Sequence, residues 1–549
     1  MKTDAQVRWP ADRVAAYIET GCWRGEPIGS LLWQWAERSG ERIAVVDGDV
    51  RLSYNELAVR ADALAERLTA RGLACGDSVL MQLPNSWEFV VVTLACIRAG
   101  IAPVMMLPSH REYELGSIGA HVGAKAVIVP DRWRYFDHQD LAHHVAAMLP
   151  GPVQVLVVGD DVRATSVDVR ALLGTDGDAA ARRRRLDASA PASSDVALFL
   201  LSGGTTGVPK LIGRTHDDYD YNIRCCADAC AVDEETVYLT ALPAGHNFPL
   251  ANPGILGTLY RGGRVVMAPS PRPTQVFDLI ERERVTMTSA VPAVALKWVA
   301  HAVGSSYDIS SLRTLHVGGS ILAPTVAATI ATTLNCQLQQ VYGMAEGLIC
   351  YTPPNAPDHI AHHTQGKPIS PHDELKIIDP HGNPQPPGHT GELLTRGPYT
   401  PPGYHGAPQQ NATSYTPDGW YRTGDLVHLT TDGNIVVTGR VKDLINRAGE
   451  KISAGEVESL VQEIPAVAEA AAVAVPDADV GERVCLFVRL HAGATLELED
   501  VVRALTARGL AAFKIPERMI VLDDLPHTAV GKPDKKALRL LVSKPTPLP

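Results

Sequence analysis

Strand-like and helix-like segments alternate along the first part of the chain, and this alternation constrains its fold most strongly. An apolar run at 77–84 has the pattern of a buried strand, and a helical pattern follows at 86–99. An apolar run at 103–107, a helical pattern near 111–122 and the run AKAVIVP at 124–130 continue the series. Strands that alternate with helices indicate a mainly parallel sheet flanked by helices. We therefore predict an α/β fold, which the runs VYLTALP, RVVMAP and SLRTLHVGG continue to about residue 345.

One helix of this series has a clear start signal. Ser53-Tyr54-Asn55-Glu56 is a capping-box pattern, in which the serine and the glutamate satisfy each other's backbone N–H groups. It predicts a helix that runs to about Arg71. The apolar face of that helix would be formed by Leu57, Ala61, Leu64 and Leu68.

The amino-acid composition and the pattern of predicted elements change twice after this region. Between 351 and 440, proline and glycine are dense and separate short β-like runs, which predicts a small antiparallel or β-barrel subdomain. From about Lys442 a smaller α/β unit begins, with Ser453 capping a helix, two strand-like runs and a helix near 497–508. We expect a large N-terminal domain, residues 1–440, and a small C-terminal domain, residues 441–549.

Composition and charge exclude several classes of function. The chain is 45% hydrophobic and 20% charged with a net charge of −11, which is typical of a soluble protein and argues against broad binding to nucleic acid or anionic membranes. The basic run Arg182–Arg185 is an exception that we expect to be a solvated loop. The sequence contains no 18-residue apolar stretch and no signal-peptide pattern, and its nine cysteines lack zinc-ribbon spacing. We expect a cytoplasmic protein with reduced thiols.

The stretch LFLLSGGTTGVPKL, residues 198–211, joins an apolar run to a loop of small and hydroxylated residues with one lysine. Glycine allows close approach of the main chain to a ligand, and backbone N–H groups in such a loop converge on phosphate oxygens. It is not a Walker A loop, because the lysine follows proline and GK[ST] is missing. The candidate phosphate-binding residues are Ser202, Gly203, Gly204, Thr205, Thr206, Gly207 and Lys210.

Four other polar clusters each allow a structural and a functional interpretation. His246 and Asn247 follow a strand, either as a simple turn or as hydrogen-bonding groups of a flat apolar pocket that suits an aromatic acid. Glu346 lies in an apolar setting, as one partner of a salt bridge or as a ligand of phosphate-bound Mg²⁺. Asp425 ends WYRTGD, as part of an ordinary turn or as an acceptor for ribose hydroxyls. Lys532 precedes a predicted helix, either as a solubilising charge or as a functional cation.

Taken together and in this order, the motifs resemble those of the adenylate-forming superfamily of acyl-CoA synthetases, adenylation domains and luciferases. The matching motifs are LSGGTTGVPK, HNFPLANPG, YGMAEG, YRTGD, GRVKDLINRAGEKISAGEVE and Gly531-Lys532. The resemblance covers nearly the whole chain. It is closest to the stand-alone aryl-acid branch, the 2,3-dihydroxybenzoate- and salicylate-AMP ligases of siderophore and nonribosomal peptide biosynthesis.

The resemblance implies an activity and its cofactors. Such enzymes join ATP to a carboxylate with the help of Mg²⁺, release pyrophosphate and leave an acyl-AMP. They then transfer the acyl group to a thiol, here the phosphopantetheine of a separate aryl carrier protein. A carboxylate that attacks an anionic phosphate meets charge repulsion, which cations in the site relieve.

The resemblance also implies roles for individual residues. Ser202 to Gly207 and Lys210 would hold the triphosphate, and Glu346 would bind Mg²⁺. Gly319, Val341, Tyr342 and Ala345 would line the nucleotide site, with Tyr342 packing on adenine, while Asp425 would hold the ribose hydroxyls beside Arg440. The catalytic set would be Lys532, which bridges the carboxylate and the α-phosphate, together with His246 and Glu346.

The remaining implied roles concern the acid, the thiol and the movement of the small domain. The acid would be bound by Asn247, Phe248, Asn252, Gly318, Gly343 and Ile349. Gly449 and Lys451 would lie along the pantetheine path. Lys442 would be the hinge about which the C-terminal domain rotates between the two half-reactions.

Two positions bear on the subfamily and on the acid. Ala345 stands where the wider superfamily has threonine, as is usual in the aryl branch. Asn252 stands where 2,3-dihydroxybenzoate enzymes have serine and salicylate enzymes tend to have cysteine. Because an amide both donates and accepts, the acid could carry a ring nitrogen, an amino group or a differently placed hydroxyl, as in 3-hydroxypicolinate or hydroxyanthranilate. Salicylate stays an alternative.

Three other functions are alternatives to a carrier-protein-dependent ligase. An aryl-CoA synthetase would share the adenylation step but deliver the acyl group to coenzyme A; no carrier domain follows Leu538, so either acceptor would be a separate molecule. A non-catalytic acyl-AMP-binding relative predicts loss of the charged residues. The charged residues that are nevertheless present are Lys210, Glu346, Asp425, Arg440 and Lys532. A Rossmann oxidoreductase is disfavoured because no G-x-G-x-x-G opens a βαβ unit.

Overall fold

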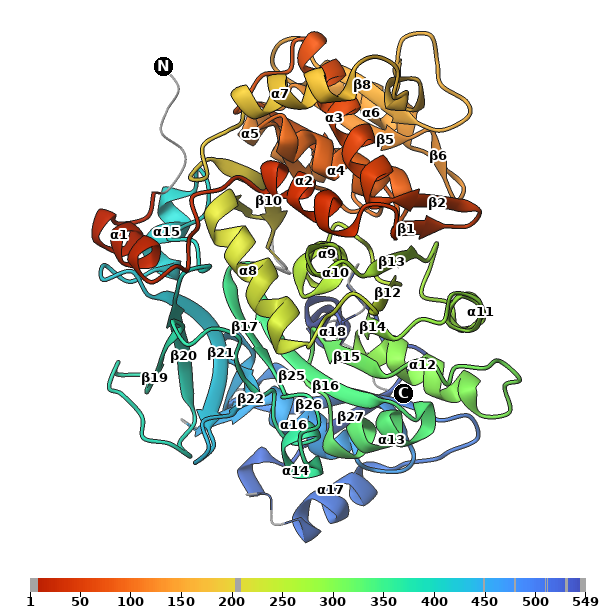
Figure 1. Ribbon diagram of the computed structural model, residues 1–549. Coiled ribbons are helices and arrows are strands. Elements are labelled where there is room, and N and C mark those ends of the chain that lie inside the picture. The colour runs from red at the N-terminus through yellow and green to blue at the C-terminus, as the bar shows by residue number, and fades with distance from the viewer. Residues whose placement is uncertain are drawn as a thin grey trace.

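The computed structural model describes residues 8–202, 209–447, 450–477, 480–508, 510, 512–528 and 532–543. Its largest element is a nine-stranded sheet, which is parallel from β16 to β1 and antiparallel at both edges (Figure 1). In spatial order its strands are β18 (Lys367–Pro368), β17 (Gly347–Tyr351), β16 (Gln337–Met344), β15 (Thr314–Gly318), β14 (Met287–Ala290), β12 (Val237–Thr240), β13 (Arg264–Met267), β1 (Ile43–Asp47) and β2 (Val50–Ser53).

The second sheet has seven strands and is parallel except for the pair β10–β11. In spatial order its strands are β11 (Leu211–Thr215), β10 (Val196–Leu201), β4 (Ala102–Met105), β3 (Ser78–Met81), β5 (Ala126–Pro130), β8 (Gln154–Val158) and β9 (Val167–Asp168). A small hairpin, β6 (Arg132–Trp133) and β7 (Phe136–Asp137), stands apart from it. The predicted parallel α/β architecture is confirmed.

Helices fill the space between the two large sheets and cover their outer faces. The inner helices contribute to one apolar core that contains side chains of both sheets, such as Val45 and Val265 of the first and Val79 and Leu198 of the second. The helices are α1 (Ala11–Glu19), α2 (Ile28–Ser39), α3 (Tyr54–Ala70), α4 (Trp87–Arg98), α5 (Glu112–Val122), α6 (His138–Met148), α7 (Ala179–Ala188), α8 (His216–Ala229), α9 (Asn247–Ala251), α10 (Gly254–Arg261), α11 (Pro273–Glu283), α12 (Pro292–Ala302) and α13 (Pro324–Leu334). Helices α11 to α13 cover the outer face of the nine-stranded sheet, and α5 and α6 that of the seven-stranded sheet.

The predicted capping box at the start of α3 is present. Ser53 Oγ accepts from the backbone N–H of Glu56 at 3.2 Å, and the Glu56 carboxylate accepts from the N–H of Ser53 at 2.8 Å. The apolar face of α3 is buried as the sequence predicts. Burying such a face supplies most of the stabilisation of a helix in a folded protein.

The expectation of a solvated loop at Arg182–Arg185 is wrong. These residues lie within α7, which packs against α3, and Arg182 is only 5% exposed. Arg182 Nε and Arg185 Nε each lie 3.0 Å from the carboxylate of Glu66 on α3. Two of the four arginines therefore share one carboxylate that lies more than a hundred residues away in the sequence.

Two smaller sheets complete the fold. The proline- and glycine-rich region forms a four-stranded antiparallel sheet, β19 (Glu374–Ile378), β20 (Gly391–Arg396), β21 (Tyr421–Leu429) and β22 (Ile435–Arg440), with α14 (Asp358–Ala361) and α15 (Pro408–Ser414) nearby in the chain. The C-terminal sheet contains β24 (Glu450–Ser453), β23 (Leu444–Arg447), β26 (Gly481–Leu490), β25 (Val467–Asp477) and β27 (Arg518–Val521). Its helices are α16 (Ala454–Gln462), α17 (Leu498–Ala507) and α18 (Lys535–Ser543). Among the described helices, none has the length and apolar character needed to cross a membrane.

Candidate active site

The ends of the predicted phosphate-binding loop are held together by hydrogen bonds just beyond the paired strands β10 and β11. Ser202 N–H donates to Lys210 O at 3.0 Å, and Ser202 Oγ accepts from Lys210 N–H at 3.0 Å. Lys210 Nζ lies 5.0 Å from the centroid of the Tyr404 ring, within cation–π range. Gly203, Gly204, Thr205, Thr206 and Gly207 lie outside the described residues.

Glu346 is buried in the turn between β16 and β17. Tyr404 donates its hydroxyl to Glu346 Oε1 at 2.8 Å, and the hydroxyl oxygens of Tyr404 and Tyr421 are 3.2 Å apart. Burial raises the pKa of Glu346 above its ordinary value, although the hydrogen bond from Tyr404 opposes the shift. Glu346 is thus a carboxylate in an enclosed place where a cation would stabilise its charge.

Asp425 is fixed by two partners. Arg440 Nε lies 2.8 Å from Asp425 Oδ1, because β21 and β22 pair these two residues directly. Tyr342, near the end of β16, donates its hydroxyl to Asp425 Oδ2 at 2.8 Å. A buried carboxylate that accepts from an arginine and a tyrosine is held in one orientation, and its remaining lone pairs can accept further donors.

Lys532 brings the C-terminal part of the chain into this region. A cavity of about 1720 Å³ is lined by residues from the nine-stranded sheet, the four-stranded sheet and the C-terminal sheet. Among the candidate site residues, its lining includes Gly319, Val341, Tyr342, Gly343, Asp425, Arg440, Lys442 and Lys532. Burial, followed by the positive charge of Arg440, lowers the pKa of Lys532 to about 8.

His246 precedes α9 and lies close enough to Lys532 to feel its charge. Burial lowers the pKa of His246 to about 4, and the neighbouring His110 and Lys532 add to the shift. The imidazole is therefore neutral at pH 7. It donates a hydrogen bond from one ring nitrogen and accepts one at the other, without adding positive charge beside Lys532.

The residues predicted to bind the acid meet at α9 and the β15–β17 region. Phe248, Val341 and Ile349 share one apolar cluster, and Gly318 packs so closely on Val341 that a Cβ at position 318 would lie 2.7 Å from Val341 O. Asn247 Oδ1 accepts from the hydroxyl of the buried Tyr219 at 2.9 Å. Asn247 Nδ2 is buried and finds no acceptor among the described residues.

Asn252 is oriented by α8. Asn222 Nδ2 donates to the backbone carbonyl of Ala251 at 3.3 Å, which fixes which end of the Asn222 amide is the donor. The same nitrogen donates to Asn252 Oδ1 at 2.9 Å, and Cys226 Sγ lies 3.5 Å from that oxygen. The oxygen of the Asn252 amide is thus taken, and the group that the side chain can offer elsewhere is its NH₂.

Several residues fall outside these clusters or were not found from the sequence. Lys451 lies on β24, where it pairs with Asn446 of β23, and Gly449 lies outside the described residues. Ala345 O accepts from Arg214 Nη1 at 3.3 Å. The sequence analysis did not identify Tyr404 or Asn222 as site residues, because each makes its contact with a residue 30 or more positions away. For Tyr404 the run RGPYTPPGYHG was a weak signal, and for Asn222 there was none.

Comparison with known proteins agrees with this arrangement. AMP-binding enzymes match residues 32–405, and the C-terminal domain of such enzymes matches residues 456–532. A salicylyl-CoA synthase / salicylate adenylyltransferase of Streptomyces sp is 55% identical over 99% of this chain and 98% of its own length. The 2-hydroxy-7-methoxy-5-methyl-1-naphthoate–CoA ligase of Streptomyces carzinostaticus is 51% identical over 97% and 96%.

Among solved structures, the apo structure of Mycobacterium smegmatis MbtA superimposes with a TM-score of 0.74 at 41% identity, covering 98% of this chain and all of that one. The fold, the site geometry and these similarities agree with one another. The chain therefore belongs to the family of AMP-binding enzymes, as an adenylate-forming ligase of the aryl-acid branch.

Proposed function

We propose that this ligase activates an aromatic acid with a hydroxyl ortho to the carboxylate, using ATP, and then transfers the aroyl group to a phosphopantetheine thiol with release of AMP. The observation that carries the proposal is the convergence of Asp425, Arg440 and Lys532 on one cavity, although the first two come from the four-stranded sheet and Lys532 from a loop near the C-terminus. Such a cavity provides a fixed hydrogen-bond acceptor for sugar hydroxyls and a lysine for the reacting anions.

In the adenylation step, an oxygen of the acid attacks the α-phosphorus of ATP and pyrophosphate leaves. Both reactants are anions, so the ammonium of Lys532 would lower the barrier as charge spreads over the α-phosphate. Lys210 would do the same for the leaving pyrophosphate, and Asp425 would orient the ribose. Holding both reactants in line removes much of the entropic cost of their encounter.

The residues present suit Mg²⁺ at Glu346. The carboxylate is buried, and the tyrosine hydroxyl that contacts it is a neutral group, so its negative charge is uncompensated by that bond. Mg²⁺ prefers one or two carboxylates together with phosphate oxygens. When bound, it supplies positive charge that offsets the phosphates.

We infer the identity of the acid from the names of two relatives and from the side-chain amides of Asn247 and Asn252. The acids named for the two Streptomyces relatives share a hydroxyl next to the carboxylate. Asn247 Nδ2 is a buried donor without an acceptor among the described residues, and a ligand hydroxyl or carboxylate would supply one. Asn252 offers an NH₂ group, which favours acids with an acceptor at that end, such as a hydroxyl oxygen or a ring nitrogen.

For the acceptor, the sequence alone favoured an aryl carrier protein over coenzyme A. The names of the relatives at 55% and 51% identity both include coenzyme A, so we propose coenzyme A as the first acceptor to test. Both acceptors present the same pantetheine thiol, so the adenylation step and its residues are common to the two.

A pyrophosphate-exchange screen tests the acid. It compares salicylate, 2-hydroxy-1-naphthoate, 2,3-dihydroxybenzoate, 3-hydroxypicolinate, 3-hydroxyanthranilate and unsubstituted benzoate. We expect exchange with an ortho-hydroxy acid and at least about tenfold less with benzoate, since a buried donor would lose its partner. Absence of exchange with every acid would refute the proposal. Incubation of the preformed adenylate with coenzyme A or with a phosphopantetheinylated carrier protein then identifies the thiol.

A further inference from the structure

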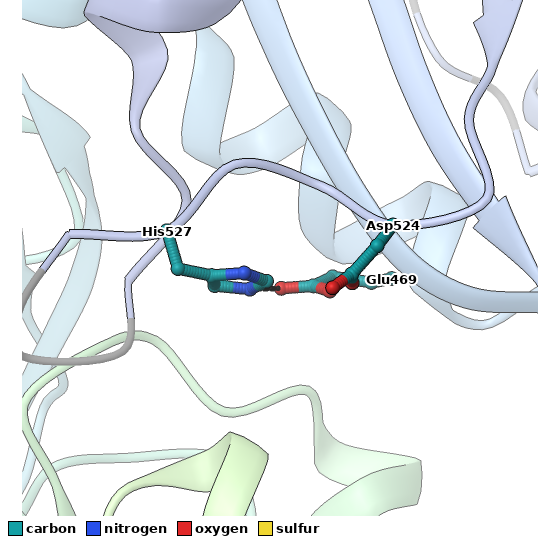
Figure 2. A group of neighbouring side chains, drawn as sticks. All are labelled: Glu469, Asp524 and His527. Atoms are coloured by element: carbon teal, nitrogen blue, oxygen red, sulfur yellow. Dashed lines mark hydrogen bonds and ion pairs between the residues drawn. The ribbon is translucent and has the colours of Figure 1, made fainter. Parts of the chain in front are cut away.

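A cluster of charged side chains lies beside the loop that carries Lys532. Glu469 on β25, Asp524 and His527 lie within reach of one another, and Figure 2 shows the imidazole of His527 pointing at Glu469. His527 Nε2 is 2.7 Å from Glu469 Oε1. The Glu469 side chain is 13% exposed, whereas that of Asp524 is 79% exposed.

The same three residues have the composition of a metal site, but Arg489 on β26 argues for a different role. Arg489 Nε lies 3.5 Å from Glu469 Oε2 and 3.7 Å from Asp524 Oδ1. A guanidinium beside both carboxylates already supplies the positive charge that a metal ion would bring. The cluster is therefore a network of polar and charged side chains in which the His527–Glu469 contact is the shortest.

The network connects to Lys532 through the backbone. Thr528 N–H donates to Lys532 O at 2.7 Å, and Thr528 Oγ1 accepts from Lys532 N–H at 3.2 Å. His527 and Pro533 form an isolated β-bridge. Lys532 is therefore bonded to Thr528, whose neighbour His527 contacts Glu469 on β25. We use the name lysine turn for the described residues His527, Thr528, Lys532 and Pro533 alone.

Lys532 needs such an anchor because its own surroundings repel it. Arg440 and Lys442 both act on it with like charge, and the nearby carboxylate of Asp425 is already paired with Arg440. Before the anionic substrates bind, electrostatic attraction alone does not hold the ammonium in the cavity. The force that keeps it there must come from the scaffold on which the lysine turn is mounted.

We propose that His527 and Glu469 are positioning residues that hold the lysine turn on the C-terminal sheet in the geometry required for adenylation. The inference rests on the proposed role of Lys532 in that step. It adds two residues that lie in the lining of the same cavity and that act through the placement of Lys532.

Three variants at the cluster test this. His527→Ala removes the contact with Glu469, and His527→Gln keeps a donor at nearly the position of Nε2. Asp524→Asn is the matched control, because it alters the same cluster while leaving the His527–Glu469 contact in place. Pyrophosphate exchange measures adenylation, and thioester formation from supplied aryl-AMP measures the second half-reaction.

We expect His527→Ala to lower kcat for exchange about tenfold with KM for ATP and acid changed less than about twofold, since the lost contact matters in the transition state. Thioester formation from supplied adenylate should be unchanged. His527→Gln and Asp524→Asn should both behave like the wild type. Thermal denaturation of each variant shows whether folding is intact.

Other outcomes overturn the proposal. Equal loss in both half-reactions would indicate general damage to the C-terminal sheet. If Asp524→Asn or His527→Gln were as impaired as His527→Ala, the His527–Glu469 contact would not be the feature that positions Lys532. If the wild type exchanges pyrophosphate and His527→Ala does so at the same rate, only this inference fails, whereas an inactive wild type overturns it together with the proposed function.

Discussion

Asp425 and Arg440 face each other across β21 and β22, with Arg440 Nε 2.8 Å from Asp425 Oδ1. Tyr342 holds the other oxygen of the same carboxylate at 2.8 Å. The pair thus fixes an acceptor at the wall of the cavity and links the four-stranded sheet to the nine-stranded one through the end of β16. Strand register alone places these two residues opposite each other.

The first prediction concerns this carboxylate. Asp425→Asn turns one acceptor oxygen into an NH₂ group that faces Arg440 or Tyr342, so the fixed orientation is lost and a ribose hydroxyl loses a charged acceptor. Hydrogen bonds to charged groups contribute about 1.5–3 kcal/mol, so we expect KM for ATP to rise about tenfold or more. Pyrophosphate exchange at varied ATP checks this. Asp432→Asn, in the exposed turn between the same strands, should leave KM unchanged.

The second prediction is uptake of a proton on nucleotide binding. The pKa of Lys532 is lowered to about 8 by burial and by Arg440, so at pH 8.5 most of the free enzyme carries a neutral amine. Phosphate anions favour the ammonium and raise this pKa, hence binding at pH 8.5 takes up protons and binding at pH 7 takes up few. Calorimetry of ATP binding in buffers of different ionisation enthalpy measures the uptake. Lys532→Gln should abolish the difference between the two pH values, and an unchanged difference would contradict the assignment.

The local elements were predictable because their signals lie within a few residues. The Ser53–Glu56 capping box and the strands of the parallel sheets need only short-range pattern and hydrophobicity. The prediction for Arg182–Arg185 is wrong because the partner of Arg182 and Arg185, Glu66, lies on another helix. No residue near the run indicates that contact.

The site residues also fall into those that local sequence signals identify and those that only the structure reveals. Asp425 and Glu346 stand out in sequence as polar residues in motifs, and the structure adds the partners that orient them, Tyr342, Arg440 and Tyr404. Asn222 could not be found, because its importance arises only when α8 packs beside the residue that ends α9. Side-chain partnerships across elements depend on tertiary packing, which a single sequence does not encode in any local pattern.

The third prediction follows from the pair Asn222–Asn252. Asn252→Ala removes the NH₂ that we expect to meet an acceptor on the acid, and Asn222→Ala frees the Asn252 amide to rotate. Each variant should reduce the preference in kcat/KM for acids with an acceptor over those without by about 1–3 kcal/mol, the cost of an unmet hydrogen bond. Because both act through one amide, the double variant should lose little more than either single variant. Additive losses in exchange assays would show that Asn222 acts independently of Asn252.

The fourth prediction concerns stability at Asp373, whose partner Tyr399 also accepts from the backbone N–H of Ile349. The Asp373 carboxyl accepts from the Tyr399 hydroxyl at 2.5 Å on Oδ2, while Oδ1 is buried and has no partner among the described residues. Burial raises the pKa of Asp373 to about 8, from an ordinary value of 3.8. The folded protein therefore binds a proton at Asp373 more tightly than the unfolded chain does between these two pH values. In that window stability falls as pH rises, and above about pH 8 the loss is complete.

Asp373→Asn removes this dependence because an amide is neutral at every pH. Its advantage in melting temperature over the wild type should grow from pH 5 to pH 8 and then level off. Thermal denaturation across this range measures the difference. Asp49→Asn, at the exposed β1–β2 turn, should show a difference from the wild type that does not change in this way. A constant offset for Asp373→Asn would mean that the carboxyl is already ionised in the folded protein near neutral pH, with Tyr399 as a sufficient partner for its charge.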